Sequence, residues 1–301
     1  MAGAPSAVTD LLQALVDGLL EGGLLALVAV GFTLVWGVLN EINLAHGALV
    51  VLAAYLTWEL SASAGLNPLL AGLTAIAVVA ALGYALQRGL LNLVARAPVL
   101  LPLLVTFGAG LLLRDAMVAA FSSDDRTLVT AYSLSAFRVG GVYLPVLRLW
   151  SLVLAVTLTT GVALGLRHTR HGMAIRAVGM DRDAARLVGI PVRHVYALTF
   201  AAGAALAGAA GAMVAAVGTF SPVSTDVYTL ESFVIAVVGG IGNTSGALAG
   251  GLALGVLEAL AGQYLPGELV SAIAFAVLLL ALVLRPQGIV GRARYSARVD
   301  R

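Results

Sequence analysis

Long apolar segments separated by short polar ones dominate the chain. The first covers residues 11–39 and consists mainly of Leu, Val, Ala and Gly. A helix needs about 20 apolar residues to cross a bilayer, so segments of this kind predict membrane-spanning helices. The other apolar segments cover residues 44–60, 68–86, 99–121, 144–166, 195–217, 247–264 and 268–284, with a shorter one at 232–238. The pattern predicts an all-α integral membrane protein, a polytopic helical bundle of about eight to nine spans.

The composition supports this interpretation and narrows it. Of the 301 residues, 60% are hydrophobic and 11% are charged, whereas a soluble domain has roughly a quarter charged residues. A water-soluble globular protein is therefore excluded. Spans with short loops use up the length, so residues 1–301 are expected to form a single transmembrane domain with no separate soluble catalytic domain.

The charged residues exclude several kinds of site. All 17 basic residues are Arg, and the chain has no Cys. A phosphate-binding P-loop requires a Lys, so the chain is not expected to hydrolyse ATP itself. Thiolate metal sites and cysteine nucleophiles are excluded too, and no His cluster has metal-ligand spacing. Arg114 lies beside Asp115 inside a predicted span, as a local pair or at an interface.

The arginines also predict an orientation. They concentrate in residues 88–96, 167–193 and 285–301, and basic loops are retained in the cytoplasm. The N-terminus is then outside and the C-terminus inside, which requires an odd number of crossings. Either the short segment at 232–238 also crosses or one of the other segments is re-entrant.

Small residues at four-residue spacing predict close helix packing, because helices in lipid associate where their backbones can approach. Such spacings occur in three places: Gly203, Ala207 and Gly211; Gly246 and Gly250; Gly251 and Gly255. They favour a compact bundle over a loose set of anchors.

Two polar turns interrupt the apolar pattern. Residues 40–47, Asn-Glu-Ile-Asn-Leu-Ala-His-Gly, separate the first two apolar segments. They are either a broken helix lining a polar cavity or a cytoplasmic turn in which His46 starts the next helix. Residues 231–246 run from Glu231 through a short apolar segment to Gly-Gly-Ile-Gly-Asn, the pattern of a discontinuous span.

The long basic loop, about residues 167–194, contains a third distinctive stretch. Residues 177–191 predict a short amphipathic helix that Asp181 caps, that Leu187 and Val188 complete on the apolar side, and that Gly189 and a following Pro end. Topology alone would need only the arginines. The added caps and apolar side favour a helix that docks in a groove of a partner protein.

At these three stretches the chain resembles the membrane permeases of branched-chain amino acid ABC importers, of the LivH type. The similarity rests on residues 31–36, on Ile-Asn-Leu-Ala-His-Gly at 42–47, on 184–190 with 195–200, on 239–247, and on Arg-Pro-Gln-Gly-Ile at 285–289. It runs in the same order from about residue 11 to residue 292. The resemblance implies an ABC importer permease fold with broken helices in a bacterial cytoplasmic (inner) membrane.

The resemblance also implies partners and roles. The partners would be a second permease subunit of the LivM type, two cytoplasmic ATPase subunits that bind ATP and Mg, and an extracytoplasmic solute-binding protein. No cofactor is expected in this chain. Residues 181–190 would couple it to the ATPase, through Asp181, Arg182, Asp183, Arg186, Leu187 and Gly189. The candidates for the translocation pathway are Asn43, His46, Glu231 and Asn243.

The predicted function is therefore import of branched-chain or related apolar amino acids by alternating access. Permeases of urea and short-amide importers share the same turns, and Asn243 stands where the amino acid branch often has Ser, so that alternative stays open. An autonomous secondary transporter or channel would be expected to have more charges deep in its spans. A membrane enzyme would need a nucleophile, base or metal set, and none emerges.

Overall fold

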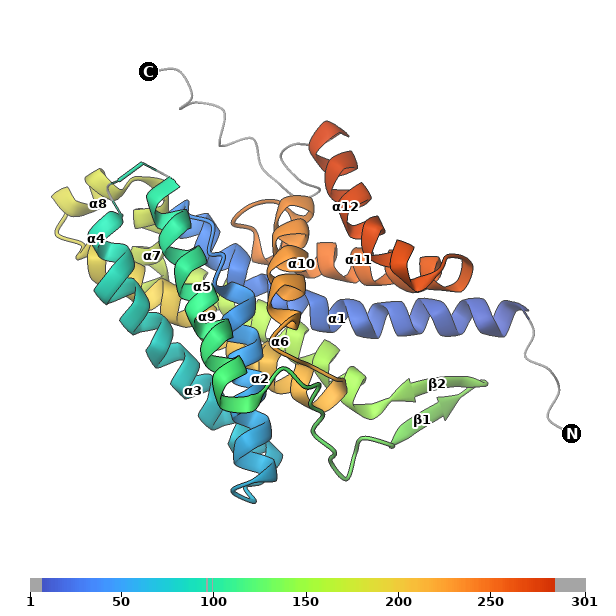
Figure 1. Ribbon diagram of the computed structural model, residues 1–301. Coiled ribbons are helices and arrows are strands. Elements are labelled where there is room, and N and C mark those ends of the chain that lie inside the picture. The colour runs from blue at the N-terminus through green and yellow to red at the C-terminus, as the bar shows by residue number, and fades with distance from the viewer. Residues whose placement is uncertain (1–6, 96, 99, 285–301) are drawn as a thin grey trace, which may run out of the picture.

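The computed structural model describes residues 7–95, 97–98 and 100–284, and these form a helical bundle (Figure 1). Its helices up to the first long loop are α1 (Ala7–Leu39), α2 (His46–Ala62), α3 (Pro68–Leu86), the π-helical turn η1 (Gln87–Leu91), α4 (Asn92–Val94) and α5 (Leu100–Phe121). The later helices are α6 (Val146–His168), α7 (Arg170–Met180), α8 (Arg182–Leu187), α9 (Val192–Val217), α10 (Ser224–Gly239), α11 (Thr244–Tyr264) and α12 (Gly267–Leu284).

Each apolar segment of the sequence forms a helix, but not all the helices have the length of a full span. Within the described residues, six are long and apolar enough to cross a membrane: α1, α3 with its extension to Val94, α5, α6, α9 and α11. The helices α2 and α10 have only 17 and 16 residues, or about 25 Å at 1.5 Å per residue. They are short because each adjoins one of the polar turns. The structure thus supports an all-helical polytopic membrane protein, and six helices in its described part are candidate spans, compared with the eight to nine expected.

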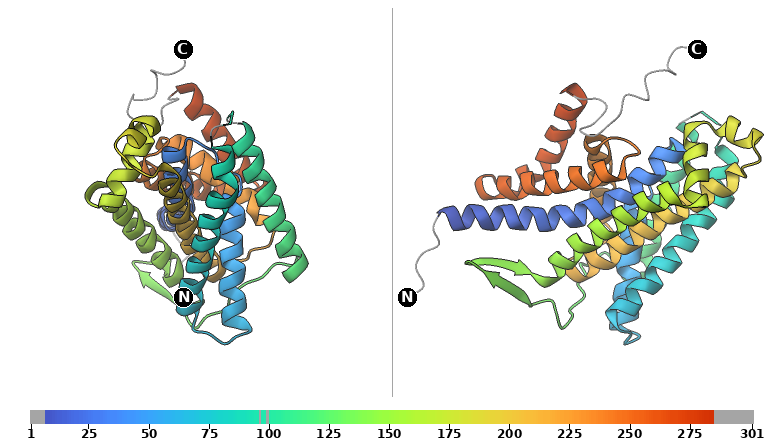
Figure 2. Two further views of the ribbon diagram at one scale, coloured as in Figure 1. Left: turned by 90° about the vertical axis from the view of Figure 1, so that its left-hand side faces the viewer. Right: turned by 180° about the vertical axis from the view of Figure 1, so that it is seen from behind.

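One element departs from the all-α expectation. Strands β1 (Ala136–Val139) and β2 (Val142–Pro145) form an antiparallel hairpin between α5 and α6. Gly140 and Gly141 connect them with φ of 60° and 91°, the left-handed backbone that a two-residue hairpin turn requires. The hairpin lies at the opposite end of the molecule from α7 and α8 (Figure 2). These two ends are called here the hairpin end and the α8 end.

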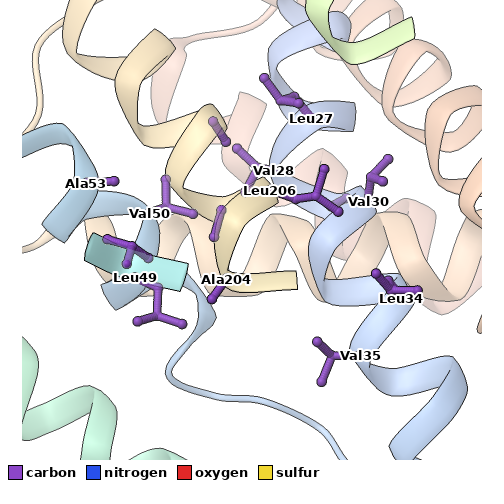
Figure 3. Packing of buried hydrophobic residues seen from close by; sticks show 14 of the residues in the cluster. Leu27, Val28, Val30, Leu34, Val35, Leu49, Val50, Ala53, Ala204 and Leu206 are labelled. Carbon is purple, nitrogen blue, oxygen red and sulfur yellow. The ribbon is translucent and has the colours of Figure 1, made fainter. Parts of the chain in front are cut away.

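The core lies where α1, α2 and α9 meet (Figure 3). Leu206 on α9 lies between Val28 on α1 and Leu49 on α2, and all three are almost fully buried. In lipid these contacts contribute packing rather than hydrophobic transfer, because the surrounding solvent is equally apolar. The outward faces of α3, α5 and α6 expose large apolar residues, as expected of surfaces that contact lipid or another membrane subunit.

Glycines allow the closest helix contacts, as their spacing predicted. Helices α1 and α11 lie side by side (Figure 1), and a methyl group added at Gly255 would collide with the backbone of Gly22. On α9, a methyl group at Gly203 would collide with Val35, and one at Gly211 with the carbonyl of Val50. Direct backbone approach therefore restricts Gly255 and Gly211 to Gly, whereas at Gly203 the nearest obstacle is a side chain.

Candidate functional site

The first polar turn is a break between α1 and α2. Helix α1 ends at Leu39, and the next residue, Asn40, has a φ of 55° and donates its N–H to the carbonyl of Trp36 at 2.9 Å. Asn tolerates this left-handed conformation better than most residues. Asn43 then turns the chain into α2: its buried side-chain oxygen accepts from the N–H of Ala45 at 3.1 Å, and its carbonyl accepts from that of His46 at 3.2 Å.

A residue that the sequence did not indicate completes this break. The hydroxyl of Thr106 on α5 accepts from the N–H of Leu44 at 3.2 Å. Its single proton has two acceptors in reach, the carbonyl of Ile42 at 3.2 Å and that of Leu103 in its own helix at 3.0 Å. Irregular backbone inside a membrane protein needs such partners because lipid supplies none. The only sequence signal was one Thr in an otherwise apolar stretch.

His46 is the first residue of α2, and its side chain is fully buried. Its Nε2 lies 2.8 Å from the carbonyl of Val28 on α1, to which the protonated nitrogen donates. The ring also meets Phe32 edge to face, with 5.5 Å between the centroids. His46 therefore connects the start of α2 to the middle of α1 and is not exposed to solvent.

The second polar turn is a break between α10 and α11. Gly240 and Gly242 adopt φ of 103° and 77°, and Asn243 caps α11 by accepting from the N–H of Gly246 at 3.0 Å. The α-carbon of Gly242 packs directly on Gly37, near the end of α1. The second break thus packs against the last turn of α1, just before the first break. The prediction of a discontinuous span did not include this contact.

Glu231 lies within α10 and not at either break. It is half-buried, and one of its carboxylate oxygens is buried with no hydrogen-bond partner. Two residues nearer the N-terminus of α10, the hydroxyl of Thr229 accepts from the N–H of Gly47 at 3.0 Å. Of the four predicted pathway residues, the structure therefore places Asn43, His46 and Asn243 at the breaks and Glu231 apart from them.

Arg114 pairs across helices rather than locally. Its Nη1 lies 2.8 Å from Oδ2 of Asp226, in the first turn of α10, and the side chains are 35% and 69% exposed. An exposed ion pair on an apolar helix such as α5 is unfavourable in lipid, so this face is expected to meet water or another subunit. The adjacent Asp115 is not its partner.

The predicted amphipathic helix at residues 177–191 is wrong in extent. Residues 177–180 belong to α7, and Asp181 separates this helix from the six-residue α8. The predicted cap is confirmed: Oδ1 of Asp181 accepts from the N–H groups of Asp183 and Ala184 at 2.9 and 3.1 Å. The division arises because a residue that caps α8 in extended conformation cannot continue α7.

The apolar side of α8 also differs from the expectation. Ala185 is the buried residue of this helix, whereas Leu187 and Val188 are 89% and 75% exposed. Arg186 pairs with Asp183 at 3.2 Å on the same helix. Gly189 ends the segment with φ of 82°. Among the predicted coupling residues, four are exposed and two are partly buried: Arg182, Asp183, Leu187 and Gly189 on the one hand, Asp181 and Arg186 on the other.

A family model described as "Branched-chain amino acid transport system / permease component" matches residues 14–282. The chain belongs to this family. The permease is 32% identical over 93% of its length to the high-affinity branched-chain amino acid transport system permease protein BraD of Pseudomonas aeruginosa, covering 96% of that protein. It is likewise 32% identical to LivH of Escherichia coli K12, over 93% and 96% of the two chains.

Two further similarities are more distant. The fructose import permease protein FrcC of Rhizobium meliloti is 27% identical over 72% of the permease and 62% of FrcC. Among solved structures, PsaBC from Streptococcus pneumoniae in complex with Fab matches with a TM-score of 0.52 and 12% identity, over 90% and 91% of the chains. That likeness concerns the fold alone. As a permease subunit of this family, the chain has no ATPase activity and binds no cofactor of its own.

Proposed function

We propose that the permease forms the membrane pathway of an ATP-driven importer for branched-chain or related apolar amino acids. Its similarity to BraD and LivH along almost the whole chain supports this solute class. The assembly would also contain a LivM-type second permease subunit, two cytoplasmic ATPase subunits and an extracytoplasmic binding protein. A urea or short-amide importer is the alternative, and the relative FrcC illustrates that similar chains can serve different solutes.

The proposed topology places the N-terminus outside and the C-terminus in the cytoplasm of a bacterial inner membrane. The α8 end is then cytoplasmic, in agreement with the arginines of residues 167–193. The six long helices would cross fully, and α2, α10 and α12 would complete an odd number of crossings. A reporter fused after Gly242 should be cytoplasmic, and an extracytoplasmic signal there would refute this topology.

The proposed docking point for the ATPase is α8. Leu187 and Val188 are exposed at the α8 end. If this end lies in the cytoplasm, contact of these apolar side chains with water is unfavourable unless a partner covers them. Asp183 and Arg186 beside them can give the contact its specificity. The residues of the proposed coupling surface are Asp181, Arg182, Asp183, Arg186, Leu187 and Gly189.

The proposed pathway passes the two helix breaks. Asn43 and Asn243 hold the breaks through side-chain hydrogen bonds to backbone N–H groups, and His46 fixes the start of α2. Glu231 would contribute from α10, away from the breaks. Alternating access then requires that the ATP-bound ATPase and the loaded binding protein favour different conformations of these segments.

The decisive experiment is reconstitution of the permease with its candidate partners in liposomes, followed by uptake of labelled L-leucine, urea and acetamide. ATP-dependent uptake of leucine, competed by isoleucine and valine, is the expected result. ATP-dependent uptake of urea or acetamide alone would establish the alternative. Solute transport by this chain without the ATPase would instead identify a secondary transporter or channel.

A further inference from the structure

A cavity of about 280 Å³ lies between the first helix break and the α7–α8 turn. Its wall combines Leu39 and Glu41 at the break, Pro102 at the start of α5, Val178 and Arg182 on α7 and α8, and Tyr196 on α9. The cavity adjoins the first break of the proposed pathway, and its wall includes Asp181 and Arg182 of the proposed coupling surface. Its volume is near the lower limit of roughly 300 Å³ for small-ligand sites, which suits a compact ligand.

Glu41 offers this cavity an acceptor that lacks a partner. The side chain is half-buried, and its Oε2 is buried with no hydrogen-bond partner. Burial raises the pKa of the Glu41 carboxyl to about 7, and the positive charge of Arg182 opposes that rise. A buried carboxylate oxygen without a donor is unfavourable unless a ligand supplies one.

Arg182 offers the same cavity a cation. Its Nη1 donates to the carbonyl of Ala95 at 3.2 Å, and its side chain also forms a hydrogen bond with Tyr196. These contacts hold the guanidinium and leave the remainder of its five N–H donors for other acceptors. Glu41 and Arg182 are not among the ion pairs within 4.0 Å found in the described part of the chain. The cavity therefore presents a carboxylate and a guanidinium that are not in direct contact.

Apolar side chains lie around the two charged groups in the cavity wall. Leu39, Pro102 and Val178 come from three separate elements around the two charged groups. A ligand complementary to this arrangement has one cationic and one anionic group close together and a small apolar part. A zwitterionic α-amino acid with an aliphatic side chain has these features in one molecule.

We propose that this cavity binds a free aliphatic α-amino acid, with its ammonium group on Glu41 and its carboxylate on Arg182. The choice of an amino acid rests on the proposed function, whereas the zwitterionic chemistry rests on the cavity itself. The ligand would contact the first break and α8 at once. It would therefore occupy the permease at the cytoplasmic mouth, at a place distinct from the binding protein.

The test is equilibrium binding of labelled L-leucine to the purified importer complex in lipid nanodiscs, without ATP and without the binding protein. L-Leucinamide lacks the carboxylate, and 4-methylpentanoate lacks the ammonium group. Each is expected to bind roughly ten- to a hundredfold more weakly than leucine, since each loses one charged hydrogen-bonded contact. Equal binding of 4-methylpentanoate would reveal a simple anion site and overturn the proposal.

Glu41→Gln keeps the size of the side chain and removes its charge. It is expected to weaken leucine binding roughly ten- to a hundredfold, whereas Glu59→Gln near the far end of α2 should leave binding unchanged. The ligand series above uses the unmodified protein, so it remains decisive if Glu41→Gln fails to assemble. Unchanged binding by an assembled Glu41→Gln complex would refute the role of Glu41.

Binding should also depend on pH. With a pKa of about 7, Glu41 is mostly protonated at pH 6 and mostly ionised at pH 8, so leucine should bind about tenfold more tightly at pH 8. The other titratable groups on the wall are Asp181, Arg182 and Tyr196. A profile that remains unchanged in Glu41→Gln would assign the pH dependence to one of them and refute the assignment to Glu41.

Failure of this proposal can be distinguished from failure of the proposed function. If the complex imports leucine with ATP but binds none without the binding protein, the cavity proposal is wrong and the function stands. If ATP-dependent uptake of leucine is absent and urea is imported instead, the proposed solute class is wrong. In that case, leucine binding to the nanodisc complex would still measure the zwitterion chemistry of the cavity.

Discussion

Replacing Thr106 by Val tests whether the first helix break depends on α5. The two side chains have almost the same shape, so the change removes a hydroxyl and little packing. Thr106 is buried, with 3% of its surface exposed. Its hydroxyl accepts from the N–H of Leu44 and lies 3.2 Å from the carbonyl of Ile42. Valine leaves the N–H of Leu44 without this acceptor, and it removes the donor that the carbonyls of Ile42 and Leu103 share.

The expected magnitude follows from the N–H of Leu44, which loses its acceptor. A buried polar group left unpaired costs about 1–3 kcal/mol, so Thr106→Val should lower the free energy of unfolding by about that amount. The matched control is Thr199→Val on α9. Thr199 is fully buried, and its hydroxyl donates to the carbonyl of Val195 in its own helix at 2.8 Å. Because that carbonyl also takes part in the backbone hydrogen bonding of the helix, losing the hydroxyl does not leave it unpaired. This control should cost less than about 1 kcal/mol.

The assay is denaturant unfolding of the purified permease in detergent micelles, together with uptake of leucine by the reconstituted complex. Thr106→Val should be less stable than Thr199→Val and should reduce uptake, and Thr106→Ser, which restores a hydroxyl, should recover most of both losses. If Thr106→Val and Thr199→Val lose the same stability, the break does not depend on Thr106. The reasoning from backbone satisfaction would then be wrong.

Three further predictions concern other parts of the molecule. The double variant Asp183→Lys, Arg186→Glu should abolish co-purification of the ATPase while membrane insertion stays normal; retained association would remove α8 as the docking point. His46→Gln, which keeps a donor for the Val28 carbonyl, should retain uptake, and loss of uptake at normal expression would indicate direct contact with solute. Gly255→Leu should destabilise the bundle by more than about 2 kcal/mol, because its side chain collides with α1. The control Gly262→Leu on the same helix should be tolerated, since a methyl group at Gly262 has no neighbour within 4 Å. Equal loss of stability by the two variants in thermal unfolding would contradict this.

The sequence predicted the helices well because each one is a continuous apolar segment between polar or glycine-containing turns. It also predicted that Asp181 caps a helix, since the cap depends on residues two and three positions away. Local patterns of this kind are visible in one dimension. The small hairpin was missed, although its Gly-Gly turn between short alternating strands is a recognisable signal.

The contacts between distant segments could not be predicted in this way. Nothing in the apolar stretch around Thr106 indicates that it satisfies a break more than 60 residues away. Arg114 was adjacent to Asp115 in sequence, yet its partner is Asp226. The exposed position of Leu187 depends on how α8 sits against α9, since a six-residue helix has too few turns to define a buried face by periodicity.

The packing at the α8 end suggests how movement of α8 would reach the pathway. Gly37, near the end of α1, packs directly on Gly242 in the second break, and the next residue, Val38, lies 3.5 Å from the position of a methyl group at Gly179 on α7. These contacts involve backbone atoms, and no long side chain lies between them to absorb a displacement. If the ATPase docks on α8, a rigid shift of α7 and α8 would press on the end of α1 and so on both breaks together. Replacing Gly37 by Ala should therefore reduce coupling of ATP hydrolysis to uptake more than it reduces ATPase association, and a parallel loss of both would contradict this route.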